Sequence, residues 1–222
     1  MKNFVRSLIL TALSFGTAGL SLNAAAQSAE AGAKKAAMCI GCHSIPGYQA
    51  SFPEIYKVPK IAGQGAQYIV SALTQYRKGA RKHPSMRAIA ASLSDQDMAD
   101  LAAFYATQSH ADDATPALPA AAASAPANVT ALLTKGNCAS CHGANFSAPI
   151  DPSYPKLAGQ YPDYLYVALK AYQTTNNAKM GRANAIMGGM AAPYTLAELK
   201  LISNYLASLP GELKTVAQSR FR

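Results

Sequence analysis

The two halves of the chain carry the same residues in the same order, and this internal repeat constrains the fold more than any other feature. The segment CIGCH at residues 39–43 recurs as CASCH at residues 138–142, and PKIAGQ at residues 59–64 recurs as PKLAGQ at residues 155–160. Three further matches follow in one register: Tyr68, Leu73 and Tyr76 with Tyr164, Leu169 and Tyr172. A repeat of this length predicts two copies of one domain.

The first repeated segment has the form C-x-x-C-H, which is the attachment signature of c-type haem. Two thiols three positions apart lie near one face of a helical turn, where each can form a thioether to a haem vinyl group. The following histidine then points its imidazole at the iron. The two motifs use all four cysteines of the chain, so we expect two covalently bound haem c groups. The expected haem-attachment residues are Cys39, Cys42, Cys138 and Cys141, and the expected first axial ligands are His43 and His142.

The second axial ligand has to come from elsewhere in each copy. Met86 lies between the expected middle and last helices of the first copy, and Met187 occupies the matching position in the second. The alanine pairs at residues 90–91 and 191–192 keep the same register. A methionine paired with histidine raises the reduction potential of the iron. The repeat therefore favours Met86 and Met187 as the second ligands.

Two other side chains compete for this role. Met190 lies only three residues after Met187, although its match in the first copy is Ile89, an apolar packing position. His83 precedes the first methionine, but its match is Asn184, so an imidazole ligand there would make the two sites unlike. Met190 stays open as an alternative in the second copy, and we expect His83 to be a surface residue.

A proximal histidine needs a hydrogen-bond acceptor that fixes its tautomer. Pro59 and Pro155 begin the second repeated segment in each copy. Their backbone carbonyls are the candidates to accept a hydrogen bond from Nδ1 of His43 and His142.

The chain is predicted to be all-α, with two tandem copies of one haem-binding domain. Apolar residues recur at helical spacing, and no strand-like alternation is present. Ser94-x-x-Asp97 and Thr195-x-x-Glu198 are predicted to be capping boxes that begin the last helix of each copy. Helices are expected at residues 31–42, from Ala66 to Lys78 with a stop at Gly79, from the first capping box to about residue 108, at residues 162–174, and from the second capping box to Pro210.

The chain begins with an expected export signal at residues 1–26, which has a basic start, an apolar middle and a small-residue cleavage site before Gln27. The mature protein is therefore expected in the periplasm. The expected domains are 27–110 and 128–222, joined by an exposed, semi-extended linker at 111–127 that is rich in Ala and Pro.

The formal net charge is +9 at pH 7. Charge alone is weak support for nucleic-acid binding, and export makes that function less favoured, so we expect no nucleic-acid partner. Five basic residues that surround the first methionine in sequence are candidates for a docking patch that attracts an acidic partner, namely Arg77, Lys78, Arg81, Lys82 and Arg87.

These motifs resemble the dihaem class I cytochromes c, and specifically the cytochrome c4 family, over essentially the whole mature chain. The resemblance implies two tandem class I cytochrome c domains, small and all-α, that are joined face to face. It also implies haem propionates near their interface and His/Met ligation of both irons. It also implies electron transfer in the periplasm from a quinol-oxidising complex, such as a cytochrome bc complex, to a terminal oxidase of the haem–copper type.

The leading hypothesis is thus an electron carrier rather than an enzyme. The main alternative is the cytochrome subunit of a periplasmic dehydrogenase, such as a sulfide or alcohol dehydrogenase. A dihaem peroxidase needs an open iron position, and a Cys-ligated thiosulfate dehydrogenase needs a fifth cysteine, which the chain lacks. A four-cysteine zinc site needs more closely spaced pairs than these, and a thioredoxin-like pair needs a βαβ context.

Overall fold

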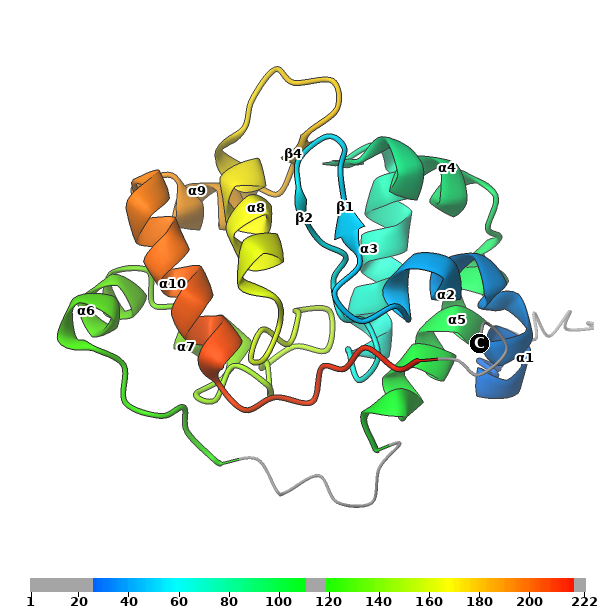
Figure 1. Ribbon diagram of the computed structural model, residues 1–222, viewed down its shortest axis with the longest axis horizontal. Coiled ribbons are helices and arrows are strands. Elements are labelled where there is room, and N and C mark those ends of the chain that lie inside the picture. Colours follow the sequence, from blue (N-terminus) through cyan, green and yellow to red (C-terminus); the bar gives the residue numbers. More distant parts are fainter. Residues whose placement is uncertain (1–25, 111–118, 218–222) are drawn as a thin grey trace, which may run out of the picture.

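The computed structural model describes residues 26–110 and 119–217, which form two helical domains that lie side by side (Figure 1). All of the expected signal peptide except residue 26, and residues 111–118 of the expected linker, lie outside the described residues. The N-terminal domain contains α1 (Ala29–Lys35), α2 (Ala37–His43), β1 (Gln49–Ala50), β2 (Tyr56–Lys57), α3 (Ala66–Lys78), β3 (Arg81–Lys82), α4 (Pro84–Ala91), α5 (Asp95–Ala106) and the 3-10 helix η1 (Thr107–His110).

The C-terminal domain repeats this order with fewer strands. It contains α6 (Ala127–Lys135), α7 (Ala139–His142), α8 (Pro162–Gln173), β4 (Gly181–Arg182), α9 (Ala185–Ala191) and α10 (Leu196–Ser208). In both domains the long middle helix and the last helix pack against each other, α3 on α5 and α8 on α10 (Figure 1). The all-α prediction is correct in its essentials, since the strands have only two residues each.

The last helix of each domain supplies the core, as its apolar spacing predicts. In α5 the buried residues include Met98, Leu101 and Tyr105, and in α10 they include Leu199 and Leu206. Both helices begin with the expected capping boxes, in which the cap hydroxyl and the carboxylate three residues later satisfy backbone N–H groups reciprocally.

The observed helix boundaries agree with the predicted ones where the sequence has a strong stop signal. They differ where tertiary packing sets the end of a helix. Helix α3 spans the expected residues and ends at Gly79, whose φ of 76° is left-handed. The expected helix at residues 31–42 is instead two helices, because the chain bends at the fully buried Ala36. Helices α4, α6, α7 and α9 were not predicted, since each is too short to give a sustained helical pattern in the sequence.

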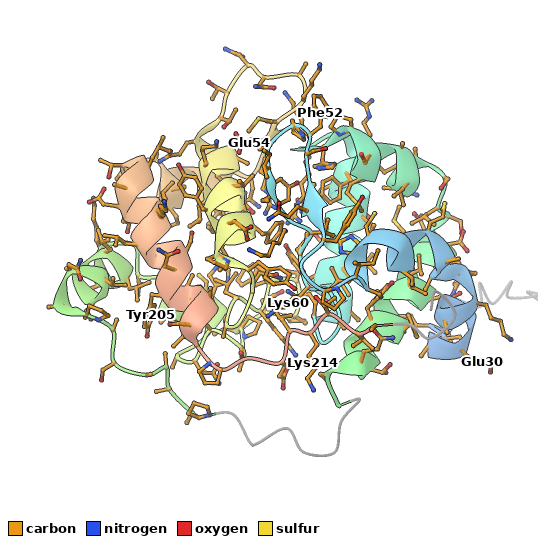
Figure 2. All side chains as sticks on the ribbon, viewed as in Figure 1. Glu30, Phe52, Glu54, Lys60, Tyr205 and Lys214 are labelled. Carbon is orange, nitrogen blue, oxygen red and sulfur yellow. The ribbon has the colours of Figure 1, made fainter. Side chains whose placement is uncertain are left out.

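Several sets of contacts join the domains. Strand β3 pairs antiparallel with β4, which places Arg81 opposite Arg182. Gln64 donates from Nε2 to the carbonyl of Lys156 and accepts its N–H, and Gln160 makes the same two bonds with Lys60, at 2.8–3.1 Å. Figure 2 shows Lys60 at the boundary between the two domains.

The β1–β2 hairpin and the C-terminal segment each cross to the other domain. Lys57 of β2 donates its N–H to the Asp163 carboxylate at 2.9 Å, and Glu54 in the hairpin pairs with Lys170 of α8. After α10 the chain runs back to the N-terminal domain, where the N–H of Lys214 bonds the Ala62 carbonyl at 3.0 Å (Figure 1). The interface is therefore made of backbone and side-chain bonds from several elements.

The described part of the expected linker is exposed for most of its length but tied to the C-terminal domain. Ala122 donates its N–H to the Ala144 carbonyl at 2.9 Å, and Tyr205 donates its hydroxyl to the Ala123 carbonyl at 2.6 Å. Helix α6 then begins at Ala127, directly after Pro126.

Candidate haem sites and the interface between them

Each pair of cysteines lies on or directly before a short helix that also carries the following histidine. Cys39, Cys42 and His43 belong to α2, and Cys138 immediately precedes α7, which carries Cys141 and His142. All four cysteines are free thiols and part-buried, so none is consumed by a disulfide. Burial raises the pKa of the Cys39 and Cys138 thiols.

The two histidines are oriented as the sequence predicts. Nδ1 of His43 lies 2.8 Å from the Pro59 carbonyl, and Nδ1 of His142 lies 3.1 Å from the Pro155 carbonyl. A carbonyl only accepts, so Nδ1 carries the hydrogen and Nε2 keeps a lone pair for a metal. Burial lowers the pKa of both imidazoles, an effect that the proline carbonyls partly offset. Each ring is thus a neutral imidazole in the form that ligates iron.

Met86 and Met187 occupy the same position on two matched helices. Each is the third residue of its helix, and each backbone N–H donates to the side chain that caps the helix. The cap is Nδ1 of His83 in α4, at 3.3 Å, and Oδ1 of Asn184 in α9, at 2.9 Å. His83 and Asn184 are thus equivalent N-cap residues. This role was not predicted from the sequence, although Asn is a common N-cap.

The candidate second ligands differ in burial and in their neighbours. Met187 is part-buried, whereas Met190 is 47% exposed on the outer side of α9. In the N-terminal domain, His83 lies close enough to His43 to lower its pKa further, which places α2 near the start of α4. In the C-terminal domain the His142 ring lies 6.4 Å from the Tyr154 ring, and no described contact joins it directly to α9.

Two arginines and four tyrosines form a symmetric cluster at the interface. Arg81 is 4% exposed and donates from Nη1 to the Tyr68 hydroxyl at 3.2 Å. Arg182 donates from Nη2 to the Tyr164 hydroxyl at 3.0 Å. The guanidinium groups also lie over the rings of Tyr76 and Tyr172, at 5.7 and 5.4 Å from the ring centroids.

This cluster has positive charge without a matching negative charge. Within the described residues, no carboxylate forms an ion pair with Arg81 or Arg182, although like charges face each other across β3 and β4. Burying an unpaired charge costs several kcal/mol, on the order of the stability of a small domain. Haem propionates would supply the missing carboxylates, so the cluster fits the cofactor that the cysteine motifs predict.

The expected docking patch has to be corrected. Arg81 is buried in the interface cluster, and Arg77 is held by the Asp95 carboxylate and the Leu93 carbonyl. Lys78, Lys82 and Arg87 remain exposed.

Two general findings bear on the alternatives. Within residues 26–110 and 119–217, no group of three or more His, Cys, Asp or Glu side chains is placed to hold a metal ion directly. In the same residues, every helix is too short or too polar to traverse a lipid bilayer.

Comparison with known proteins agrees with this geometry. The family model described as cytochrome c matches the chain twice, at residues 29–109 and 127–210. The chain is 30% identical to a cytochrome c4 of Azotobacter vinelandii over 92% of this chain and 99% of that protein. It is 32% identical to a protein of Stutzerimonas stutzeri named thiosulfate dehydrogenase electron acceptor, over 87% of this chain and 93% of that one.

A solved structure supports the same conclusion. The reduced recombinant cytochrome c4 of Pseudomonas stutzeri superposes with a TM-score of 0.56 at 26% identity, covering 83% of this chain and all of the other. The similarity therefore extends over both domains and not over one of them alone.

Proposed function

We propose, from the premise that this chain belongs to the cytochrome c4 family of dihaem cytochromes c, that it carries electrons in the periplasm between a quinol-oxidising complex and a terminal oxidase. It is an electron-transfer cytochrome with two covalently bound haem c groups and redox proteins as partners. What the proposal adds is the compartment, the ligand set and the two kinds of partner.

One observation carries the proposal. In each domain a free C-x-x-C pair is followed directly by a neutral histidine whose Nδ1 is fixed by a proline carbonyl. In our proposal Cys39, Cys42, Cys138 and Cys141 anchor the two groups, and His43 and His142 ligate the irons through Nε2. Bound haem would supply the one-electron iron couple.

The methionines complete the proposed ligand set. Met86 and Met187 would supply the second protein ligand to each iron, since the matched N-caps place them identically on α4 and α9. With a histidine and a methionine on each iron, no position would be left for a substrate, and the methionine sulfur would raise the potential. Arg81 and Arg182 would neutralise propionate carboxylates at the interface.

A reconstitution experiment tests the proposed route. Holoprotein purified from the periplasm is mixed with a purified cytochrome bc complex and quinol, and its reduction is followed by absorbance. A purified haem–copper oxidase then has to reoxidise it. Reduction and reoxidation within each enzyme's turnover time support the proposal, and failure of either step contradicts it.

A second candidate function is the acceptor of a periplasmic dehydrogenase. The relative named as a thiosulfate dehydrogenase electron acceptor favours this candidate. It is distinguished by replacing the cytochrome bc complex and quinol with a purified thiosulfate dehydrogenase and thiosulfate. Faster reduction by the dehydrogenase than by the bc complex would make this second candidate the better one.

A further inference from the structure

A groove of about 420 Å³ lies on the outward face of α4, away from the side that carries the candidate iron ligand. Its lining includes Arg87, Ala88 and Ala91, which recur on one face of the helix and are exposed. Ala90, on the other face, is fully buried. Ala178 of the C-terminal domain also lines the groove, hereafter the basic groove, so residues of both domains contribute to it.

The basic groove carries positive charge that the protein does not neutralise. Lys82 and Arg87 line it, and the exposed Lys78 and Lys179 lie beside lining residues in sequence. No Asp or Glu occurs in residues 77–93 or 174–184. Within the described residues none of these four cations forms an ion pair.

Two of these cations are held in place by neutral groups. The Lys82 ammonium donates to the Asn177 carbonyl at 2.7 Å, and the Lys179 ammonium lies 5.1 Å from the centre of the Phe52 ring. A carbonyl and an aromatic ring position a cation but leave its charge available to a partner. Figure 2 shows Phe52 at the top of the hairpin, near the loop that precedes β4.

The repeat shows that this charge is not required by the fold. The positions that match Lys78, Lys82 and Arg87 in the C-terminal domain hold Thr174, Ala183 and Gly188, which are all uncharged. The outer side of α9 instead exposes apolar side chains. Ile186 is 63% exposed and Met190 is 47% exposed. The two matched faces therefore have different chemistry, one basic and one neutral.

We propose that the basic groove, with Lys82 and Arg87 at its centre, is the docking surface for a carboxylate-rich segment of a redox partner protein. Such a segment would lie against the helix whose inner side carries Met86, so the partner would exchange electrons with the N-terminal domain. The neutral matching face of the C-terminal domain would not bind it. This inference rests on the proposed electron-carrier function and names the chemistry of one partner.

The groove is tested with hexaglutamate peptide as the probe and ¹⁵N-labelled, fully oxidised holoprotein. The titration is followed by NMR at about 10 mM salt, where screening is weak, and repeated at about 0.15 M. We expect shifts confined to residues 78–91 and 177–180, and affinity that falls as salt rises. Shifts centred on the C-x-x-C-H segments or on α9, or no binding at low salt, overturn the proposal.

Charge reversals with equal change in net charge separate the groove from general attraction. Arg87→Glu is expected to weaken peptide binding about tenfold, since an attractive charge becomes a repulsive one at the contact. Lys200→Glu, at an exposed position on α10, is the matched control and should weaken it less than about twofold. Equal losses in the two variants would contradict the proposal.

Two further measurements keep the result independent of folding and of the proposed function. Lys179 lies in a loop outside α4. Lys179→Glu therefore repeats the test without changing the helix that carries Met86. This variant should also weaken peptide binding more than the control does. Each variant is first checked for two haems and reversible reduction. Intact redox behaviour without groove binding refutes the docking surface alone, whereas loss of haem in the wild type refutes the carrier function.

Discussion

The N-terminal and C-terminal domains repeat each other at the positions that would hold a haem and differ in the contacts around them. The histidine–proline bond, the N-capped methionine and the capping box recur in both. Another recurring bond joins a glycine of the second repeated segment to the last helix: the N–H of Gly63 donates to the Tyr105 carbonyl at 2.8 Å, and the N–H of Gly159 donates to the Leu206 carbonyl at 3.0 Å. The contacts that would position a haem are therefore present in both domains.

The first helix of each domain shows the difference most clearly. Helix α1 crosses α5 at Gly32, where a side chain would collide with the backbone carbonyl of Asp100. The matching residue of α6 is Ala131, which is exposed. Helix α6 is held instead by the Tyr194 hydroxyl, which donates to the Leu132 carbonyl at 2.8 Å. The first helix is thus packed tightly in one domain and attached more loosely in the other.

The largest expected effect comes from removing one methionine ligand at a time. Met86→Ala should lower the reduction potential of one haem by an amount on the order of 0.1 V or more, because a thioether ligand favours ferrous iron, and should leave the other haem unchanged. Met187→Ala should do the same to the other haem. Redox titration followed by absorbance measures both.

The neighbouring methionine provides the control for this prediction. Met190→Leu keeps an apolar side chain at a 47% exposed position, so both potentials should stay at their wild-type values. A lowered potential in Met190→Leu, with Met187→Leu unaffected, would move the ligand to Met190.

The next effect concerns the tight helix crossing. Gly32→Ala should lower the free energy of unfolding of the N-terminal domain by about 2 kcal/mol, because α1 has to move away from α5. The control Ala131→Ser, at the exposed matching position, should change the free energy by less than about 0.5 kcal/mol. Urea unfolding of the holoprotein, followed by circular dichroism, compares them. Equal effects would show that the two first helices are packed alike.

The interface predicts a symmetric pair of effects. Gln64→Ala leaves the N–H and carbonyl of Lys156 without their partners, and Gln160→Ala does the same to Lys60. Each variant should lose about 1–2 kcal/mol of stability, by similar amounts. Gln49→Ala, at an exposed position, is the control and should have no measurable effect. A large effect of one glutamine only would indicate that the pseudo-symmetric bonds are not equivalent.

The smallest expected difference appears on acidification. The Lys35 ammonium, followed by the Ser28 N–H, lowers the pKa of Asp100, and Lys35 also lowers the pKa of Asp97. A carboxyl with a lowered pKa stabilises the folded state above its ordinary pKa of about 4, and this contribution is lost as the pH falls below that value. The C-terminal domain has Leu201 at the position of Asp100.

The N-terminal domain should therefore lose stability first as the pH falls from about 5 to 3. The measurement is the unfolding midpoint of wild type and Asp100→Asn across that range, with limited digestion by pepsin, which is active in acid, to identify the domain that opens. Asp100→Asn should flatten the pH dependence of the N-terminal domain. Earlier opening of the C-terminal domain would be the contrary result.

Much of this organisation follows from sequence because its signals are local. The repeat, the capping boxes, the glycine stop of α3 and the proline acceptors were predicted from short patterns, and the structure confirms these features. The ligand residues themselves stay predictions, supported by their matched positions.

The remaining features depend on contacts between distant residues. The burial of Arg81 was missed because a charged residue in a basic run is ordinarily a surface residue, and only the pairing of β3 with β4 places it in the interface. The return of the C-terminal segment to Ala62 has no local signal either. The capping role of His83 was open to prediction. Its match, Asn184, is a residue type common at N-caps, and Pro84 directly after His83 is a residue type common at the first helical position.

The central claim is that each domain independently holds one haem between a histidine and a methionine. The most direct measurement is the haem content of the purified holoprotein together with the weak far-red band of methionine-ligated ferric haem. We predict two haems per chain, and a band that falls to half its intensity in Met86→Ala and likewise in Met187→Ala. One haem per chain, or a band that survives either substitution undiminished, would contradict the account.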